Sequence, residues 1–154
     1  MIDRFNAAIL RLLQRDGTLT QRALAELVNL SPNACWNRVQ ALKKAGVITG
    51  QTTRLDREKL GLDLVVFVMV RTRHHSLDWL KRFRAHVSTI PEVIDFFRIG
   101  GDYDYLLKVV TRDMANYDAV YQKLIAGVEL DSVTSYFAME AIEEQRPLPI
   151  RETG

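Results

Sequence analysis

The spacing of apolar residues changes near residue 60, and this change limits the fold more than any other feature of the chain. Before it, apolar side chains such as Phe5, Ile9 and Leu12 recur with the period of an α-helix. After it come short runs rich in Val, Phe and Tyr, beginning with LVVFVMVRT at residues 64–72, which are typical of β-strands. The sequence therefore predicts an α+β protein with a helical first part and a mixed second part.

Three side chains that can cap a helix precede the apolar stretches of the first fifty residues. Asp3, Thr20 and Ser31 can each accept a hydrogen bond from the free N–H groups of a first helical turn. Pro32 follows at the first position of the third helix, where its missing N–H costs nothing. A tight turn separates the second and third helices, so residues 1–50 are expected to form a three-helix, winged-type helix-turn-helix domain.

The third predicted helix has two chemically different faces. Cys35, Val39 and Leu42 follow helical spacing and form its buried stripe. Because Cys35 is the only cysteine, it is interpreted as a small core residue rather than a redox sensor. A lone cysteine also excludes an intrachain disulfide and a multi-cysteine zinc site.

The opposite face of this helix suits the DNA major groove, where the first residues of a recognition helix meet base edges. Asn33, Asn37 and Gln40 carry paired donors and acceptors that match adenine, and Arg38 can reach a guanine or a phosphate. Trp36 fits two interpretations, a contact with a sugar or thymine methyl, or a cover for the core edge. The predicted DNA contacts are Gln21, Arg22, Ser31, Asn33, Ala34, Trp36, Asn37, Arg38, Gln40, Lys43 and Lys44, with Gln21 and Arg22 placed for phosphates and the lysines for phosphates or solvent.

The charge distribution agrees with a nucleic-acid partner for the first part alone. Residues 1–60 hold ten Lys and Arg against five Asp and Glu, whereas residues 61–154 hold eleven against fourteen. The overall charge of +2 therefore hides a basic first third and a mildly acidic remainder. Such an asymmetry indicates that one part meets a polyanion while the other has a different task.

The second part alternates predicted strands and helices. Ser76 caps a helix that is expected to direct Leu77, Leu80, Phe83 and Val87 inward, and Asp113 opens another. The strands are expected at residues 64–72, 93–99, 103–111 and 132–142, with a Gly-Gly-Asp hairpin turn between the second and third. This β-α-β-β-α-β order predicts a ferredoxin-like domain with one sheet face left for a partner, most simply a second copy. The expected domains are 1–50, a linker at 51–63, an effector-binding and oligomerisation domain at 64–143, and a tail at 144–154.

Several classes of function have no support in the sequence. No apolar run approaches a membrane span, and the first residues lack the pattern of a signal peptide, so a cytoplasmic location is expected. There is no phosphate loop, metal-ligand spacing or nucleophile elbow, so no residue can be assigned to catalysis, a metal or a cofactor.

Four motifs stand out over both parts: LAELVNLSPNACWNRVQALKKAGVI at 24–48, LDREKLGL at 55–62, IGGDYDYLLKV at 99–109 and SYFAMEAI at 135–142. They resemble motifs of the Lrp/AsnC family of bacterial and archaeal transcription regulators. They occur in the expected order and spacing over nearly the whole chain. One departure is Asn33-Ala34, where many members have Thr-Pro, which alters the base-contacting tip and leaves the fold intact.

The resemblance implies that the second domain binds a small effector, typically an amino acid, while it builds dimers and often octameric rings. Family effector sites lie between dimers, near the hairpin after the second strand and along the last strand. On this sequence the resemblance points to Gly100, Gly101, Asp102, Tyr103, Asp104, Met114, Tyr136, Phe137 and Ala138.

The hairpin has the chemistry that an amino-acid zwitterion needs. A Gly-Gly turn can offer amide donors to a carboxylate with no Cβ in the way. Asp104 or Asp102 can accept from the ammonium group. The alternative is a surface hairpin with two solvated aspartates.

Two adjacent histidines follow the first strand. His74 and His75 point to opposite sides of an extended segment, so they are expected to be loop or interface residues rather than a chelating pair. HHS, together with DYDYL and FAME, most resembles a cysteine-responsive branch of the family, which implies cysteine as the effector.

The leading hypothesis is a transcriptional regulator that binds double-stranded, pseudo-palindromic promoter sites as a dimer or larger oligomer and responds to an amino acid. One alternative is a non-enzymatic nucleoid protein that bends DNA with weak sequence preference. Another is an amino-acid-binding regulatory subunit, or an enzyme subunit, whose helical half docks onto protein.

Overall fold

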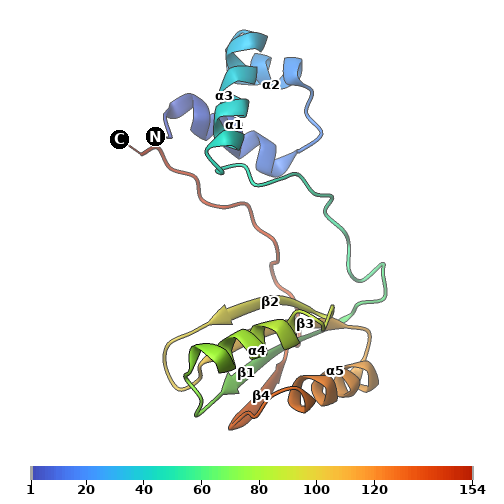
Figure 1. Cartoon of the computed structure of the whole chain (residues 1–154). Coiled ribbons are helices and arrows are strands. Elements are labelled where there is room, and N and C mark those ends of the chain that lie inside the picture. The colour runs from blue at the N-terminus through green and yellow to red at the C-terminus, as the bar shows by residue number, and fades with distance from the viewer. Residues whose placement is uncertain (1, 154) are drawn as a thin grey trace. The chain divides into compact units, whose positions relative to one another are not determined.

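The computed structural model describes residues 2–153, which divide into two compact units. The first unit holds residues 2–54 together with 143–153, and the second holds residues 55–142. The first is helical and the second is a sheet with helices, as Figure 1 shows. The predicted α+β class and both predicted folds are confirmed.

The first unit contains helices α1 (Arg4–Arg15), α2 (Gln21–Leu27) and α3 (Pro32–Lys44). All three begin at the predicted caps, because Asp3, Thr20 and Ser31 each accept a hydrogen bond from a first-turn N–H. Their shared core includes Ile9 and Leu24 with the predicted α3 stripe. Helix α3 is therefore held by one face and exposes the other.

The last eleven described residues, 143–153, also belong to this helical unit. The side-chain amide of Gln14 and the backbone of Leu148 exchange two hydrogen bonds, of 2.7 and 3.2 Å. Arg11 donates to the carbonyl oxygen of Ile150, and the Ile150 side chain packs against the helical core. The backbone of Thr153 pairs with that of Ile2. The segment that the sequence set apart as a polar tail is thus built into the same unit as α1.

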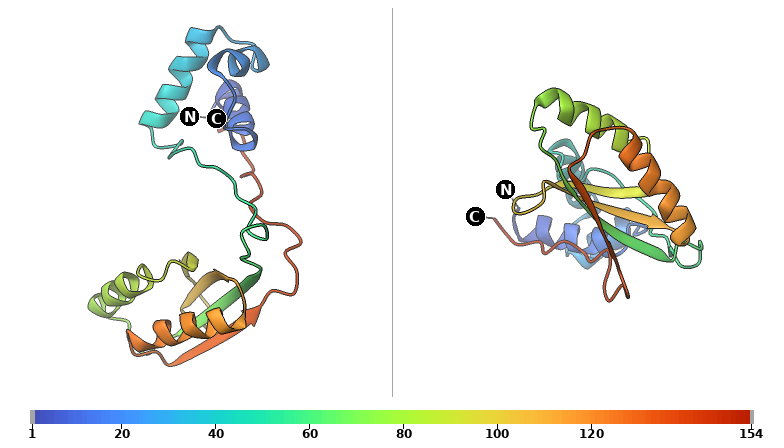
Figure 2. Two further views of the ribbon diagram at one scale, coloured as in Figure 1. Left: turned by 90° about the vertical axis from the view of Figure 1, so that its right-hand side faces the viewer. Right: turned by 90° about the horizontal axis from the view of Figure 1, so that it is seen from below.

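The second unit has a four-stranded sheet in the order β2-β3-β1-β4, with every neighbouring pair antiparallel. Helices α4 (Leu77–Val87) and α5 (Met114–Ala126) cover one face of it (Figure 2). The strands are β1 (Leu64–Arg71), β2 (Val93–Arg98), β3 (Tyr105–Thr111) and β4 (Ser132–Phe137). Strand β3 starts two residues later than predicted, and β4 ends at Phe137 rather than at residue 142, where its register with β1 stops.

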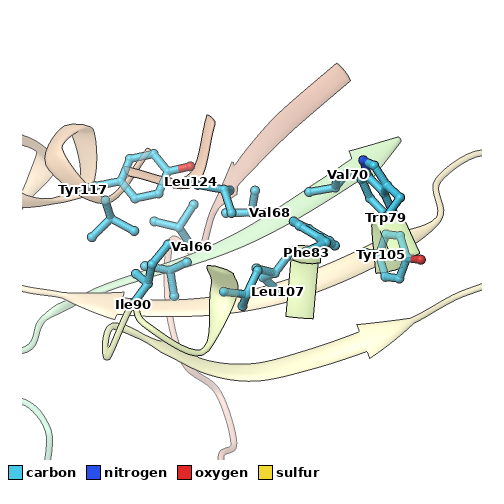
Figure 3. Packing of buried hydrophobic residues seen from close by; sticks show 13 residues of the cluster. Val66, Val68, Val70, Trp79, Phe83, Ile90, Tyr105, Leu107, Tyr117 and Leu124 are labelled. Atoms are coloured by element: carbon cyan, nitrogen blue, oxygen red, sulfur yellow. The ribbon is translucent and has the colours of Figure 1, made fainter. Parts of the chain in front are cut away.

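The core of the second unit lies between the sheet and its helices. Val66, Val68 and Val70 alternate along β1 and point toward the helices, as the period of a strand requires. Phe83 of α4 is fully buried, with its ring 4.9 Å from that of Trp79 and 5.1 Å from that of Tyr105 (Figure 3). The prediction that Leu77 points inward is wrong, because it is 75% exposed and Trp79 fills the core position instead.

The other face of the sheet, called here the helix-free face, is covered by neither α4 nor α5. Phe67 of β1 stands opposite Tyr136 of β4, and Met69 and Phe97 both flank Leu106 of β3. Phe67, Phe97 and Tyr136 are exposed. An apolar surface of this kind on a regular sheet is typical of a contact with another molecule.

Candidate nucleic-acid interface and effector site

The exposed face of α3 carries polar side chains at both ends of the helix. Asn33 and Asn37 are exposed and one turn apart, so they project from the same side. Trp36 beside them is half exposed, at 50%. Lys43 and Lys44 are exposed in the last turn. This face combines carboxamides at one end with two positive charges at the other.

One capping hydrogen bond orders the start of α3, and a second hydrogen bond joins it to α2. The Ser31 hydroxyl accepts the Ala34 N–H at 3.2 Å, and the Gln21 side chain donates to the Pro32 carbonyl oxygen at 3.2 Å. Gln21 therefore connects the two helices of the motif, a role its sequence position did not reveal. The predicted phosphate contact of Gln21 stays a prediction. On the inner side of α3, burial raises the pKa of the Cys35 thiol, as expected for a core cysteine.

The remaining predicted DNA residues lie in different surroundings. Arg22 is exposed and pairs with Glu26 one turn away at 3.1 Å, an exposed pair that can open without much loss. Gln40 is partly buried. Arg38 turns toward α1, where its guanidinium lies 2.6 Å from the carboxylate of Asp3. The contact of Arg38 with DNA stays a prediction.

The hairpin between β2 and β3 is ordered by backbone hydrogen bonds. Gly101 has φ of 119°, a conformation that side chains with a Cβ rarely adopt. The Asp104 backbone accepts from Ile99 and donates to Val70, both at 2.9 Å. The Asp104 carboxylate accepts the N–H of buried Thr72 at 2.8 Å. The hairpin is thus tied to the end of β1 and holds Asp104 in place.

A second set of contacts surrounds Tyr103. Arg71 lies over the Tyr103 ring at 5.4 Å and donates to the Asp102 carbonyl oxygen at 2.6 Å. The Tyr103 hydroxyl lies 3.2 Å from the hydroxyl of Thr134 on β4. Hydrogen bonds with Thr134 and Tyr136 lower the pKa of Tyr103. The candidate effector site therefore also includes three residues that were not predicted, Arg71, Thr72 and Thr134. They come next to the hairpin only through the pairing of the strands.

One copy of the chain does not bring all nine predicted effector residues together. The hairpin meets the Arg71 end of β1, whereas Met114 follows β3 just after Thr111, which pairs with Leu64 at the other end. Seven residue steps separate Arg71 from Leu64, about 23 Å along the strand. Phe137 belongs to the far group, since it pairs with Val66 and its ring lies 5.4 Å from that of Tyr117 on α5. Ala138 follows it.

The histidine pair lies in the loop between β1 and α4. The Nε2 atom of His74 is 3.4 Å from a carboxylate oxygen of Glu129, and the neighbouring Arg73 pairs with Asp131 at 2.6 Å. These contacts join the segment after β1 to the loop before β4. His74 is therefore a loop residue, as predicted.

Residues 2–153 contain no group of three or more His, Cys, Asp or Glu side chains that could hold a metal ion. None of the helices in that range has the length and apolar character that crossing a membrane requires.

Comparison with family models covers both units. Residues 2–49 match the winged helix-turn-helix DNA-binding model, and residues 65–148 match the Lrp/AsnC ligand-binding domain. A helix-turn-helix followed by a separate ligand-binding domain defines an effector-responsive, DNA-binding transcriptional regulator. The chain belongs to the Lrp/AsnC family, which confirms the resemblance predicted from the sequence.

Individual relatives agree over nearly the full length. The DNA-binding transcriptional activator DecR of Escherichia coli K12 is 46% identical over 151 residues, covering 97% of this chain and 99% of the relative. The glutamate uptake regulatory protein of Zymomonas mobilis is 45% identical over 153 residues, covering 99% and 93%. Both relatives are named as regulators, which agrees with the match of residues 2–49 to a DNA-binding model.

Solved structures of similar proteins share the fold. An AsnC family transcriptional regulator from Agrobacterium tumefaciens superimposes with a TM-score of 0.92 at 48% identity, covering 96% of each chain. A transcriptional regulator from Neisseria meningitidis, solved in complex with L-Met, gives 0.90 at 32% identity, covering 97% of each. The second structure shows that this fold can hold a free amino acid.

Proposed function

We propose that a dimer of this chain presents two copies of α3 to a pseudo-palindromic promoter site, and that an amino acid bound at the β2–β3 hairpin alters this binding. The observation that carries the proposal is the exposed Asn33–Asn37 pair on a helix whose opposite face is fully buried. Bidentate carboxamides are matched to adenine in the major groove. Lys43 and Lys44 supply the phosphate contacts.

A gel-shift titration of the whole protein on the DNA upstream of its own gene tests this proposal. Specific binding should exceed binding to random DNA at physiological salt by about a thousandfold or more. Equal affinity for both DNAs would instead favour the alternative of a nucleoid protein that binds without sequence preference.

The effector is proposed to bind where copies of the chain meet. The hairpin offers the Gly100 and Gly101 amides for a carboxylate and the Asp102 and Asp104 carboxylates for an ammonium group. Met114 and Phe137 lie at the other end of the sheet in the same copy, so a complete site has to draw them from another copy. The Neisseria complex supports an amino acid as the ligand. Among amino acids we propose cysteine, on the HHS, DYDYL and FAME motifs, and a cytoplasmic site of action.

The Asp104→Asn variant should lose its response to the effector and keep its affinity for DNA. Asparagine retains an oxygen that can accept the Thr72 N–H, so the hairpin should stay in place while the negative charge that would meet the ammonium is lost. Gel shifts with and without each amino acid measure the response. The Asp102→Asn variant, measured in the same way, shows which of the two carboxylates meets the ammonium group. If only Asp102→Asn abolishes the response, the ammonium partner is Asp102.

Dimerisation is proposed to use the helix-free face of the sheet. It is apolar, spans β2, β3, β1 and β4, and exposes Phe67 near its middle. A second copy of the same face would cover it symmetrically, as in most homodimers. Further association of dimers into tetramers or octamers would then create the inter-copy effector sites.

The Phe67→Glu variant should weaken dimerisation by about 3 kcal/mol or more, roughly a hundredfold in the dissociation constant. Each new carboxylate would be buried in the interface, whereas in the monomer it stands opposite Lys108 and can be paired. Sedimentation velocity over a range of concentrations measures the shift. The control is Leu77→Glu, a change at an exposed leucine of α4. Identical behaviour of the two variants would place the interface elsewhere.

A further inference from the structure

Arg38 lies on the flank of α3 that faces α1. One nitrogen of its guanidinium, Nη1, is 2.6 Å from Oδ2 of Asp3 and 3.1 Å from Oδ1 of Asn6. The guanidinium carbon lies 5.2 Å from the centre of the Phe5 ring. Three contacts at the start of α1 therefore hold one side chain of the DNA-facing helix.

The carboxylate of Asp3 serves both helices at once. Its Oδ1 atom accepts the Asn6 N–H at 2.8 Å and so caps α1, while Oδ2 accepts from Arg38. These two interactions lower the pKa of Asp3, with the Asn6 amide contributing more than Arg38. Because each oxygen has its own partner, a single carboxylate joins the start of α1 to the middle of α3.

The buried stripe of α3 does not by itself fix how far the helix is rotated about its axis. Cys35, Val39 and Leu42 fix which face of α3 is inside, but apolar packing is non-directional and tolerates small rotations. A charge-assisted hydrogen bond has a defined length and direction. The Asp3–Arg38 contact can therefore set the angle at which Asn33 and Asn37 leave the surface.

We propose that Arg38 is a positioning residue for DNA recognition, which fixes α3 on α1 through Asp3 and does not itself read a base. The inference rests on the proposed reading face of α3 and assigns the specificity of that face to a pair of residues outside it. It replaces the contact of Arg38 with guanine or phosphate that the sequence predicted.

The two roles differ in what they require of Asp3. If Arg38 leaves Asp3 to contact DNA, the Asp3 carboxylate competes with the DNA, and its removal should leave affinity unchanged or raise it. If Arg38 positions α3, removal of the carboxylate should lower specific affinity in the same way as removal of Arg38. The sign of the Asp3 effect therefore separates the two roles.

The experiment is a double-mutant cycle on DNA binding by the full-length protein, with Asp3→Asn, Arg38→Ala and the double variant. Asparagine is also a good helix cap, so Asp3→Asn removes the charge and keeps α1 intact. We expect each single variant to lose about tenfold in specific affinity and the double variant to lose no more than either. Binding to random DNA should change far less, because Lys43 and Lys44 are untouched.

Two measurements keep the outcome decisive. Base preference should weaken across the whole half-site, whereas loss of a reading residue would relax it at one position. Circular dichroism at the temperature of the assay verifies that each variant is folded. If Arg38→Ala is not folded, the result for Asp3→Asn decides between the two roles. Unchanged or tighter specific binding by Asp3→Asn, or additive losses in the cycle, would overturn the inference. If the unaltered protein shows no sequence preference, the proposed function fails instead.

Discussion

Replacing Asn33 and Asn37 together with alanine should remove most of the sequence preference of the protein and leave its fold intact. Both side chains are exposed and one turn apart near the start of α3, and each can form a bidentate contact with a base. Two such contacts are worth about 2–6 kcal/mol of discrimination. Alanine favours helix more than asparagine does, so α3 should be at least as stable.

Competition gel shifts with specific and random DNA measure this effect as a ratio of affinities. The matched control is the Lys43→Ala, Lys44→Ala double variant at the other end of the same helix. It should weaken binding to both DNAs equally and make the dependence on salt shallower by about two phosphate contacts. The assignment of α3 as the reading helix is contradicted if the asparagine variant lowers both affinities equally.

The Phe83→Ala variant should destabilise the α/β unit by about 3–5 kcal/mol. Its ring is fully buried and lies against three other aromatic rings, those of Trp79, Phe96 and Tyr105. Truncation leaves a cavity between α4 and the sheet that neighbouring side chains cannot fill, because two of the rings are fixed on strands. A loss of this size is a large part of the stability of a small domain.

The chain offers a simple way to observe this unit alone. It has two tryptophans, Trp36 in the helical unit and buried Trp79 in the α/β unit. In a Trp36→Phe background, fluorescence during urea unfolding reports on Trp79 only. The control is Leu77→Ala, a change in the same helix at an exposed side chain, which should alter stability by no more than about 0.5 kcal/mol. A similar midpoint for both variants would contradict the importance of the aromatic core.

Local chemistry made much of the fold predictable. The caps Asp3, Thr20 and Ser31 and the stripe of α3 follow from side-chain type and helical period, and the structure contains each of them. The order of strands and helices in the second unit follows from the change in period. The same reasoning failed for Leu77, because periodicity alone could not decide between it and Trp79 two residues later.

Contacts between distant parts of the chain could not be predicted in this way. Arg38 looks like a DNA-binding arginine in the sequence, and only the packing of α3 on α1 brings it to Asp3. Arg71, Thr72 and Thr134 reach the hairpin through strand pairing, which residue types do not specify. The division of the effector residues between two ends of the sheet likewise depends on strand register.

The return of residues 143–153 to the helical unit has a consequence for how the protein is dissected and labelled. A fragment ending at Arg54 would lack Ile150 and the backbone partners of Gln14 and Ile2, so it is an incomplete DNA-binding domain. A tag fused to the C-terminus would sit on the DNA-binding half, although the chain reaches it directly from the ligand-binding half. The polypeptide passes between the two units twice, at residues 54–55 and again at residues 142–143, so separating them intact needs two cuts.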